Sequence, residues 1–101
     1  MGEYCMNKLY RQTKDVEGIE VGGEWIIMHV KNRTLTKLNG AGGTIWSLLH
    51  TQKSVSELTV ELSKQLNYRH IIDETDVQTV LGELLQIGII ESFFEKQVNS
   101  Y

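Results

Sequence analysis

The spacing of apolar residues changes partway along the chain, and this change constrains the fold more than any other feature. The run Trp25–Val30 is rich in β-branched and aromatic residues, and Thr34–Leu38 alternates between two faces, which predicts two strands. A turn at residues 31–33 joins them, since Asn32 tolerates positive φ. From residue 39 onward, apolar residues recur every three or four positions, which is typical of helices. The connections are too short for parallel crossovers, so we predict an α+β fold with an antiparallel sheet.

The flanking segments complete the predicted sheet. Tyr4–Tyr10 has irregular strand character and is taken as the first strand. Glu17–Glu24 contains three glycines and is predicted to be a turn region, and Ile89–Phe93 a final short extended piece. The expected order is three strands, three helices and a short strand, with the helices on one face of the sheet.

The first two helices are predicted from caps and spacing. Asn39 is a suitable N-cap for a helix over about 40–50, in which Gly42 and Gly43 allow the backbone to lie close to the sheet. The segment Ser54–Glu57 forms a capping box, which predicts a second helix ending at about Asn67.

The third helix has clear signals at both ends. After a connector at Tyr68–Ile72, Asp73 is the expected N-cap of a helix over Glu74–Ile87. Gly88 stands at the position where a left-handed residue ends a helix.

Length and charge set the general class. A chain of 101 residues predicts a single domain, residues 1–101. The net charge of −3 gives no electrostatic reason to bind nucleic acid. The single Cys5 excludes an internal disulfide and a multi-cysteine metal site. Because no apolar run is long enough to span a membrane and the N-terminus lacks a signal core, we expect a cytoplasmic protein without a membrane partner.

No pattern in the sequence predicts catalysis. His29, His50 and His70 are isolated from one another and from Cys5, so neither a metal site nor a nucleophile is expected. The glycine-rich stretch 40–44 lacks the lysine and the spacing of a phosphate-binding loop. Acidic residues at the start of the third helix are explained by the helix dipole. We therefore expect that the protein is not an enzyme and has no catalytic residue, no metal and no cofactor.

The strand Thr34–Leu38 is the strongest candidate for binding. It enters a helix directly and should lie at the sheet edge, with residues 34, 36 and 38 on one face and Leu35 and Lys37 on the other. Apolar residues of the third helix span roughly 160° of its surface, which leaves one flank to line a groove beside this edge. An open edge beside an apolar groove predicts peptide capture by β-augmentation. The alternative is that the first two helices bury the whole arc.

Three sequence motifs occur in the order found in one family. The first is Leu38–Leu49, with the sequence LNGAGGTIWSLL, the second is Ser54–Leu58, and the third runs from Asp76-Val77 through Leu84-Leu85 to Gly88-Ile89-Ile90. Together they resemble the PqqD-like family over residues 24–91. The glycine pair at 42 and 43 departs from the alanine-rich form of the first motif.

The resemblance implies a winged helix-turn-helix fold that acts as a precursor-peptide recognition element. Such proteins bind a leader peptide as an extra antiparallel strand in a cleft against the third helix. Carried onto this sequence, the peptide-binding residues are Thr34, Leu35, Thr36, Lys37, Leu38, Asp76, Val77, Val80, Leu81 and Leu84. Of the helix residues, Asp76, Val80 and Leu84 are favoured to face the peptide.

The long N-terminal stretch and the free-standing length of the chain resemble the family members that serve lasso-peptide clusters. Those members deliver the precursor to a leader peptidase, a transglutaminase-like protease, and to a cyclase. The alternatives are a PqqD-type peptide chaperone for pyrroloquinoline quinone synthesis, a winged-helix DNA-binding regulator, and a subunit that docks on a larger enzyme. The DNA-binding alternative is disfavoured because Glu74–Ile87 contains no Lys or Arg.

Overall fold

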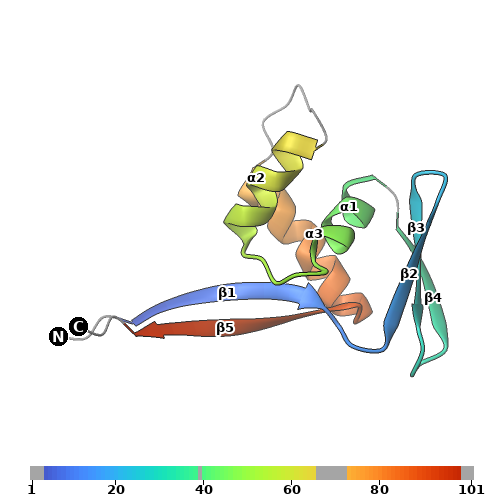
Figure 1. Cartoon of the computed structure of the whole chain (residues 1–101), viewed down its shortest axis with the longest axis horizontal. Helices are drawn as coiled ribbons and strands as arrows, with labels where there is room; N and C mark the ends of the chain where they lie inside the picture. The colour runs from blue at the N-terminus through green and yellow to red at the C-terminus, as the bar shows by residue number, and fades with distance from the viewer. Residues whose placement is uncertain (1–3, 39, 66–72, 99–101) are drawn as a thin grey trace.

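The computed structural model describes the backbone of residues 4–38, 40–65 and 73–98, and the side chains of 7–38, 40–65 and 73–95 (Figure 1). The elements follow in the order β1 (Tyr4–Gln12), β2 (Val16–Val21), β3 (Glu24–His29), β4 (Thr34–Leu38), α1 (Gly40–Leu48), α2 (Val55–Gln65), α3 (Glu74–Ile87) and β5 (Ile90–Val98). None of the helices in these ranges is long and apolar enough to cross a membrane.

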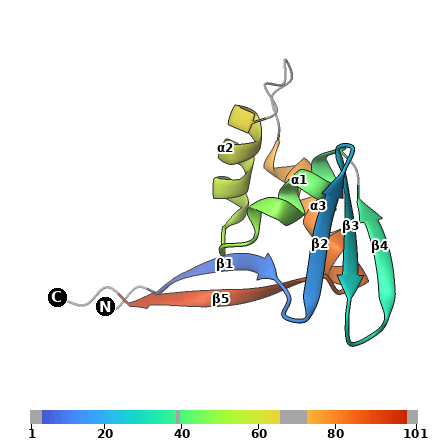
Figure 2. The same cartoon turned by 45° about the vertical axis from the view of Figure 1, so that its right-hand side comes forward.

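Three strands form an antiparallel sheet in the order β2-β3-β4. The predicted α+β class, the three-stranded antiparallel sheet and the three helices that follow it are confirmed. Figure 2 shows the helices on one side of this sheet. We call the face toward the helices the inner face and the opposite one the outer face. The winged-helix label stays a prediction of the resemblance.

The membership of the sheet differs from the prediction. The segment predicted as a turn, Glu17–Glu24, is mostly strand β2, and only Gly22 and Gly23 make the turn into β3, both with positive φ. Gly18 misled the prediction, because glycine is uncommon inside strands. Its position explains it: a Cβ atom there would overlap the ring of Trp46. Glycine therefore allows the sheet to lie against α1.

The N-terminal strand belongs to a second sheet. Tyr4–Tyr10 is predicted as the first strand of the three-stranded sheet, but β1 extends to Gln12 and pairs antiparallel with β5, from Tyr4↔Val98 to Gln12↔Ile90. β5 is accordingly longer than the short piece predicted at Ile89–Phe93. These two strands form a long ribbon below the helices in Figure 1. Alternation of apolar and polar residues indicates a strand but does not specify which strand pairs with it. The partner of β1 lies at the other end of the chain.

The helix ends follow the local signals. α3 has the predicted bounds, with Asp73 accepting a hydrogen bond from the Thr75 amide at 3.1 Å and Gly88 in the left-handed conformation. Ser54 and Glu57 form the predicted reciprocal capping box, with bonds of 3.2 and 2.9 Å. The predicted cap at Asn39, the helix end at Asn67 and the connector Tyr68–Ile72 lie outside the described residues.

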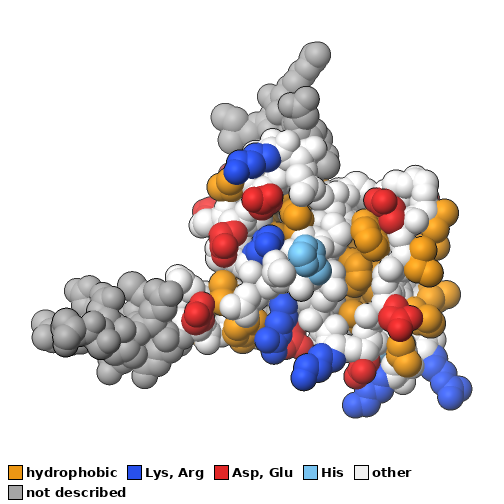
Figure 3. Space-filling view, in the orientation of Figure 1, with side chains coloured by type: hydrophobic (Ala, Val, Ile, Leu, Met, Phe, Trp, Pro, Cys, Tyr) orange, Lys and Arg blue, Asp and Glu red, His pale blue; other side chains and the backbone are white. Residues whose placement is uncertain are grey.

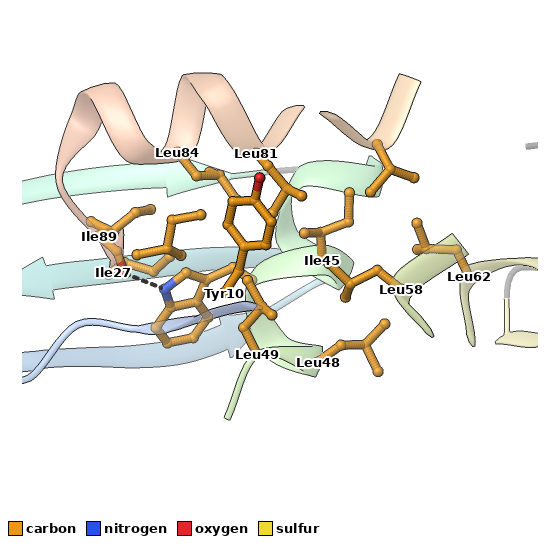
Figure 4. Close-up of a cluster of buried hydrophobic side chains, with 13 residues drawn as sticks. Tyr10, Ile27, Ile45, Leu48, Leu49, Leu58, Leu62, Leu81, Leu84 and Ile89 are labelled. Carbon is orange, nitrogen blue, oxygen red and sulfur yellow. Dashed lines mark hydrogen bonds between the residues drawn. The ribbon is translucent and has the colours of Figure 1, made fainter. Parts of the chain in front are cut away.

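The core gathers around α1 and joins all three helices to both sheets (Figure 4). Ile27 of β3, Leu49 after α1 and Leu58 of α2 are fully buried, and Tyr10 joins them from the ribbon at 5 % exposure. The indole nitrogen of Trp46 donates a hydrogen bond to the carbonyl of Ile89 at 3.3 Å, which ties α1 to the chain entering β5. Both sheets are thus held by contacts with one short helix.

Candidate functional site

β4 is an edge strand. It pairs with β3 on one side, in a register that runs from Trp25↔Leu38 to His29↔Thr34, and no other strand in the described parts of the chain pairs with its free side. The backbone N–H and C=O groups on the free side of an edge strand are available to a further strand. The edge position predicted for Thr34–Leu38 is confirmed.

Local structure at both ends explains the position of β4. The turn before it contains Arg33, whose φ of 55° is left-handed; the prediction had given this role to Asn32. The His29 ring nitrogen Nδ1 accepts a hydrogen bond from the Asn32 amide at 3.3 Å, a role within the turn. After β4 the chain turns into α1, where Gly40 has a φ of 57°. The strand therefore ends where the helix begins.

A close approach between α1 and the sheet holds this junction in place. A Cβ atom at Gly43 would lie 2.8 Å from Cδ1 of Trp25 and 3.4 Å from the carbonyl oxygen of Leu38. The first distance is shorter than van der Waals contact allows, so only glycine fits without a shift. This agrees with the prediction that small residues let the backbone lie close to the sheet.

The two faces of β4 offer different side chains. On the inner face, Thr36 is half-buried and Leu38 packs against the core. On the outer face, Leu35 is 71 % exposed, and the ammonium of Lys37 lies 3.2 Å from the Glu24 carboxylate. This alternation is the one predicted for Thr34–Leu38, and it gives a peptide strand two distinct surfaces beside it.

α3 divides the remaining predicted site residues into buried and accessible ones. Val77, Leu81 and Leu84 are 1–2 % exposed and belong to the core, so they offer almost no surface to a ligand. Val80 is half-buried and packs against that core, whereas Asp76 is exposed. That any of these five residues contacts a peptide stays a prediction. Only Asp76 and Val80 have side chains that a peptide could reach.

Sequence reasoning missed an apolar outer face on the three-stranded sheet. Figure 3 shows hydrophobic side chains gathered over these strands, at the right of the view. The large exposed ones on the sheet are Ile19 and Val21 of β2, Ile26 and Met28 of β3, and Leu35 of β4. The alternation of residues 17–21 could have indicated the β2 part of this face, had Gly18 not suggested a turn.

Metal chemistry has no visible basis in the described ranges. Among the described side chains, those of residues 7–38, 40–65 and 73–95, no three His, Cys, Asp or Glu residues are grouped so that they could hold a metal ion. His70 and the Cys5 side chain lie outside the part that the structure describes.

Comparison with known proteins adds a family and a related fold. No curated protein matches the chain. A solved structure described as "TbiB1 in Complex with the TbiA(beta) Leader Peptide" matches with a TM-score of 0.67 and 24 % identity, covering 80 % of this chain and 94 % of that one. That likeness concerns the fold.

A family model described as "Coenzyme PQQ synthesis protein D (PqqD)" matches residues 24–90. The matched segment begins at the first residue of β3 and ends at the first residue of β5, so it contains β4 and the three helices. It covers well over half of the 101 residues. The chain therefore belongs to the PqqD family.

Proposed function

We infer that this protein binds the leader segment of a ribosomally made precursor peptide as an added antiparallel strand on β4. The observation that carries the proposal is the free edge of β4, which lies inside the segment matched by the family model. The solved structure of similar fold is described as a complex with a leader peptide, which supports the same class of ligand.

Backbone pairing alone is too weak for useful affinity. A strand added along the five residues of β4 makes about four or five hydrogen bonds, each with a net contribution of ~0.5–1.5 kcal/mol. Micromolar affinity needs about 8 kcal/mol after the cost of ordering the peptide. Apolar side chains of the leader must therefore supply the remainder.

On the inner face, these leader side chains lie beside Thr34, Thr36 and Leu38. Val80 and Asp76 contribute from α3, while Val77, Leu81 and Leu84 support them from the core beneath. In biological terms the protein is a carrier, which presents the leader to a leader peptidase of the transglutaminase-like type and to a cyclase in lasso-peptide maturation. The family description favours a second candidate, a peptide chaperone in coenzyme PQQ synthesis.

Amide hydrogen exchange distinguishes the two open edges of the sheet, because β2 is the strand at the opposite edge. The ligand is the synthetic leader of the precursor peptide encoded nearest to this protein's gene. We expect amides of β4 to gain protection when the peptide binds, whereas amides of β2 keep their exchange rates. Protection at β2 alone would place the peptide on the wrong edge for this proposal.

The contribution of α3 is tested by Val80→Asp, because Val80 is half-buried at the surface. The matched control is Val60→Asp, on α2, where the side chain is 53 % exposed. Isothermal titration calorimetry should show a loss of leader affinity of at least ten-fold for Val80→Asp and none for Val60→Asp, with circular dichroism confirming the fold of both. Wild-type affinity in a folded Val80→Asp protein would remove this flank of α3 from the site. Leu84→Asp is unsuitable, since it would place a charge in the core.

A further inference from the structure

We propose that the bound leader is also read on its outward face, where Lys37 selects an acidic residue and Leu35 an apolar residue two positions later in the leader. This proposal rests on the proposed function and specifies the sequence class of its ligand. It depends on the two β4 side chains that point away from the helices.

The register follows from antiparallel pairing. Residues directly opposite one another in adjacent strands point to the same face, so the leader residues opposite Leu35 and Lys37 lie on the outer face. Because the leader runs against β4, it meets Lys37 before Leu35. The outward-facing pattern is therefore acidic-x-apolar, read from N- to C-terminus, and the intervening residue points inward beside Thr36.

Leu35 defines the apolar position. It is 71 % exposed, and its partner in β3 is Met28, which is 42 % exposed. An apolar leader residue opposite Leu35 adds a third apolar side chain beside Met28 and Leu35. Its contact with Leu35 removes apolar surface of both residues from water. A polar residue there would leave Leu35 exposed.

Lys37 defines the acidic position. Its ammonium lies 3.2 Å from the Glu24 carboxylate, and the side chain is still 66 % exposed. An ammonium has three donors, so it can bond to a second carboxylate from the strand on its other side. Glu24 already takes up part of the charge and of the donors of this ammonium, so the leader acid binds Lys37 more weakly than it would without Glu24.

Local charge favours an acidic partner. Residues 30–38 contain three of the chain's ten Lys and Arg residues, Lys31, Arg33 and Lys37, and no Asp or Glu, although the whole chain carries a net charge of −3. Within the turn and β4, the strand edge is therefore basic while the protein is acidic. A leader that approaches this edge is attracted by complementary charge.

The test uses a phage-displayed library of random dodecapeptides, selected separately on the folded wild-type protein and on each variant. Wild-type protein should enrich peptides with Asp or Glu two residues before an apolar residue. Peptides selected on Lys37→Glu should carry Lys or Arg in place of the acid. Peptides selected on Leu35→Thr should lose the preference for an apolar residue and keep the preference for an acid. Lys64→Glu, with the same change of charge on α2, and Ile19→Thr, on the same face at the β2 edge, are the matched controls and should keep the wild-type pattern.

Individual affinities make the inference quantitative. In the best enriched peptide, replacing the acid by Lys should weaken binding to wild type about two- to five-fold, as expected for an exposed cross-strand charge pair, and strengthen binding to Lys37→Glu. Replacing the apolar residue of this peptide by Ser should weaken its binding to the wild-type protein about ten-fold, because Leu35 then loses its apolar partner. Glu24→Gln should increase the preference for the acid, because the competing carboxylate is gone.

Two negative results have different meanings. Enriched peptides whose pattern is the same for wild type, Lys37→Glu and Leu35→Thr would overturn the outward reading and leave leader binding on β4 intact. Peptides that bind without protecting β4 amides from hydrogen exchange, or no enriched peptides at all, would overturn the proposed function and this inference with it.

Discussion

Two glycines in this protein have opposite environments. A Cβ atom at Gly18 of β2 would overlap atoms Cζ3 and Cη2 of Trp46. The Trp46 side chain is buried, and its ring is tilted by 55° to the ring of Trp25, with 5.4 Å between the two centroids. A Cβ atom at Gly82 in α3 meets no heavy atom within 4 Å. The absence of a side chain is thus required at Gly18, whereas at Gly82 it only increases backbone freedom in a helix.

We predict that Gly18→Ala lowers the free energy of unfolding by about 1–3 kcal/mol, because Trp46 must move within a packed core. Gly82→Ala should raise it by about 0.5–1 kcal/mol through helix propensity. Urea denaturation of the two variants beside wild type measures both values. A Gly18→Ala protein as stable as wild type would show that α1 and β2 are not in close contact.

At the scale of single elements, α3 depends on its N-terminal cap. The Asp73 side chain accepts a hydrogen bond from the Thr75 amide at 3.1 Å, which satisfies one of the free donors of the first turn. The residue itself has extended backbone, with φ −90° and ψ 144°, as an N-cap requires.

Asp73→Ala should destabilise the protein by ~1 kcal/mol, whereas Asp73→Ser should retain most of the stability because serine also caps. Thermal unfolding followed by circular dichroism at 222 nm is the measurement. Equal losses in both variants would indicate that the carboxylate charge, and not the cap, stabilises the helix.

The ribbon of β1 and β5 is stabilised differently from the three-stranded sheet. A two-stranded ribbon is marginally stable unless other groups support it. Here Nε of Arg11 donates a hydrogen bond to the Glu91 carboxylate at 2.7 Å, and the Arg11 guanidinium lies 4.6 Å from the ring centroid of Phe93. The ammonium of Lys8 lies 5.5 Å from the ring centroid of Tyr10 and 5.9 Å from that of Phe94. Cations on aromatic rings thus partly take the place of a hydrophobic core along this element.

Arg11→Met keeps the apolar stem and removes the ion pair and the cation–π contact. We expect it to lower the free energy of unfolding by no more than ~1 kcal/mol, since the ion pair is partly exposed. Amide exchange should become faster in the part of the ribbon that is N-terminal to Leu9 and C-terminal to Phe93. Arg33→Met, in the turn before β4, is the matched control and should leave the ribbon unchanged. Unaltered exchange in Arg11→Met would show that backbone pairing alone holds the two strands.

At the scale of the whole molecule, the ribbon and the helices are joined through Tyr10. Its side chain is 5 % exposed within the core, and its backbone exchanges two hydrogen bonds with Lys53, of 2.8 and 3.0 Å. The Gln12 side chain adds a bond to the carbonyl of Trp46 at 2.8 Å. These contacts connect the first element of the chain to the loop and helix at its centre.

Tyr10→Ala should therefore destabilise the entire protein, by about 3–5 kcal/mol, which is a large part of the stability of a small domain. Tyr10→Phe keeps the ring and should cost much less. Urea denaturation monitored by fluorescence and by circular dichroism should give one common transition. Separate transitions, with the ribbon lost first and the helices retained, would show that the two parts unfold independently.

Signals within short stretches of the sequence determined much of this protein. The bounds of α3, its cap at Asp73, its end at Gly88 and the Ser54–Glu57 capping box depend on neighbouring residues only, and all were predictable. The hairpin of β3 and β4 and the two faces of β4 followed from a short turn and period-2 alternation. The edge that carries the candidate site was predictable for the same reason.

Tertiary structure decided what lies between distant segments. Gly18 is part of a strand because Trp46, far along the chain, occupies the space where a Cβ would be. β1 pairs with β5 because the two ends of the chain meet, and no local pattern specifies that partner. Periodicity likewise could not say how much of α3 is covered. Packing buries Val77, Leu81 and Leu84, and of the contacts predicted on α3 it leaves only Asp76 and Val80 accessible. Local sequence determines the conformation and faces of each element, whereas burial and strand partners depend on contacts formed only when the whole chain has folded.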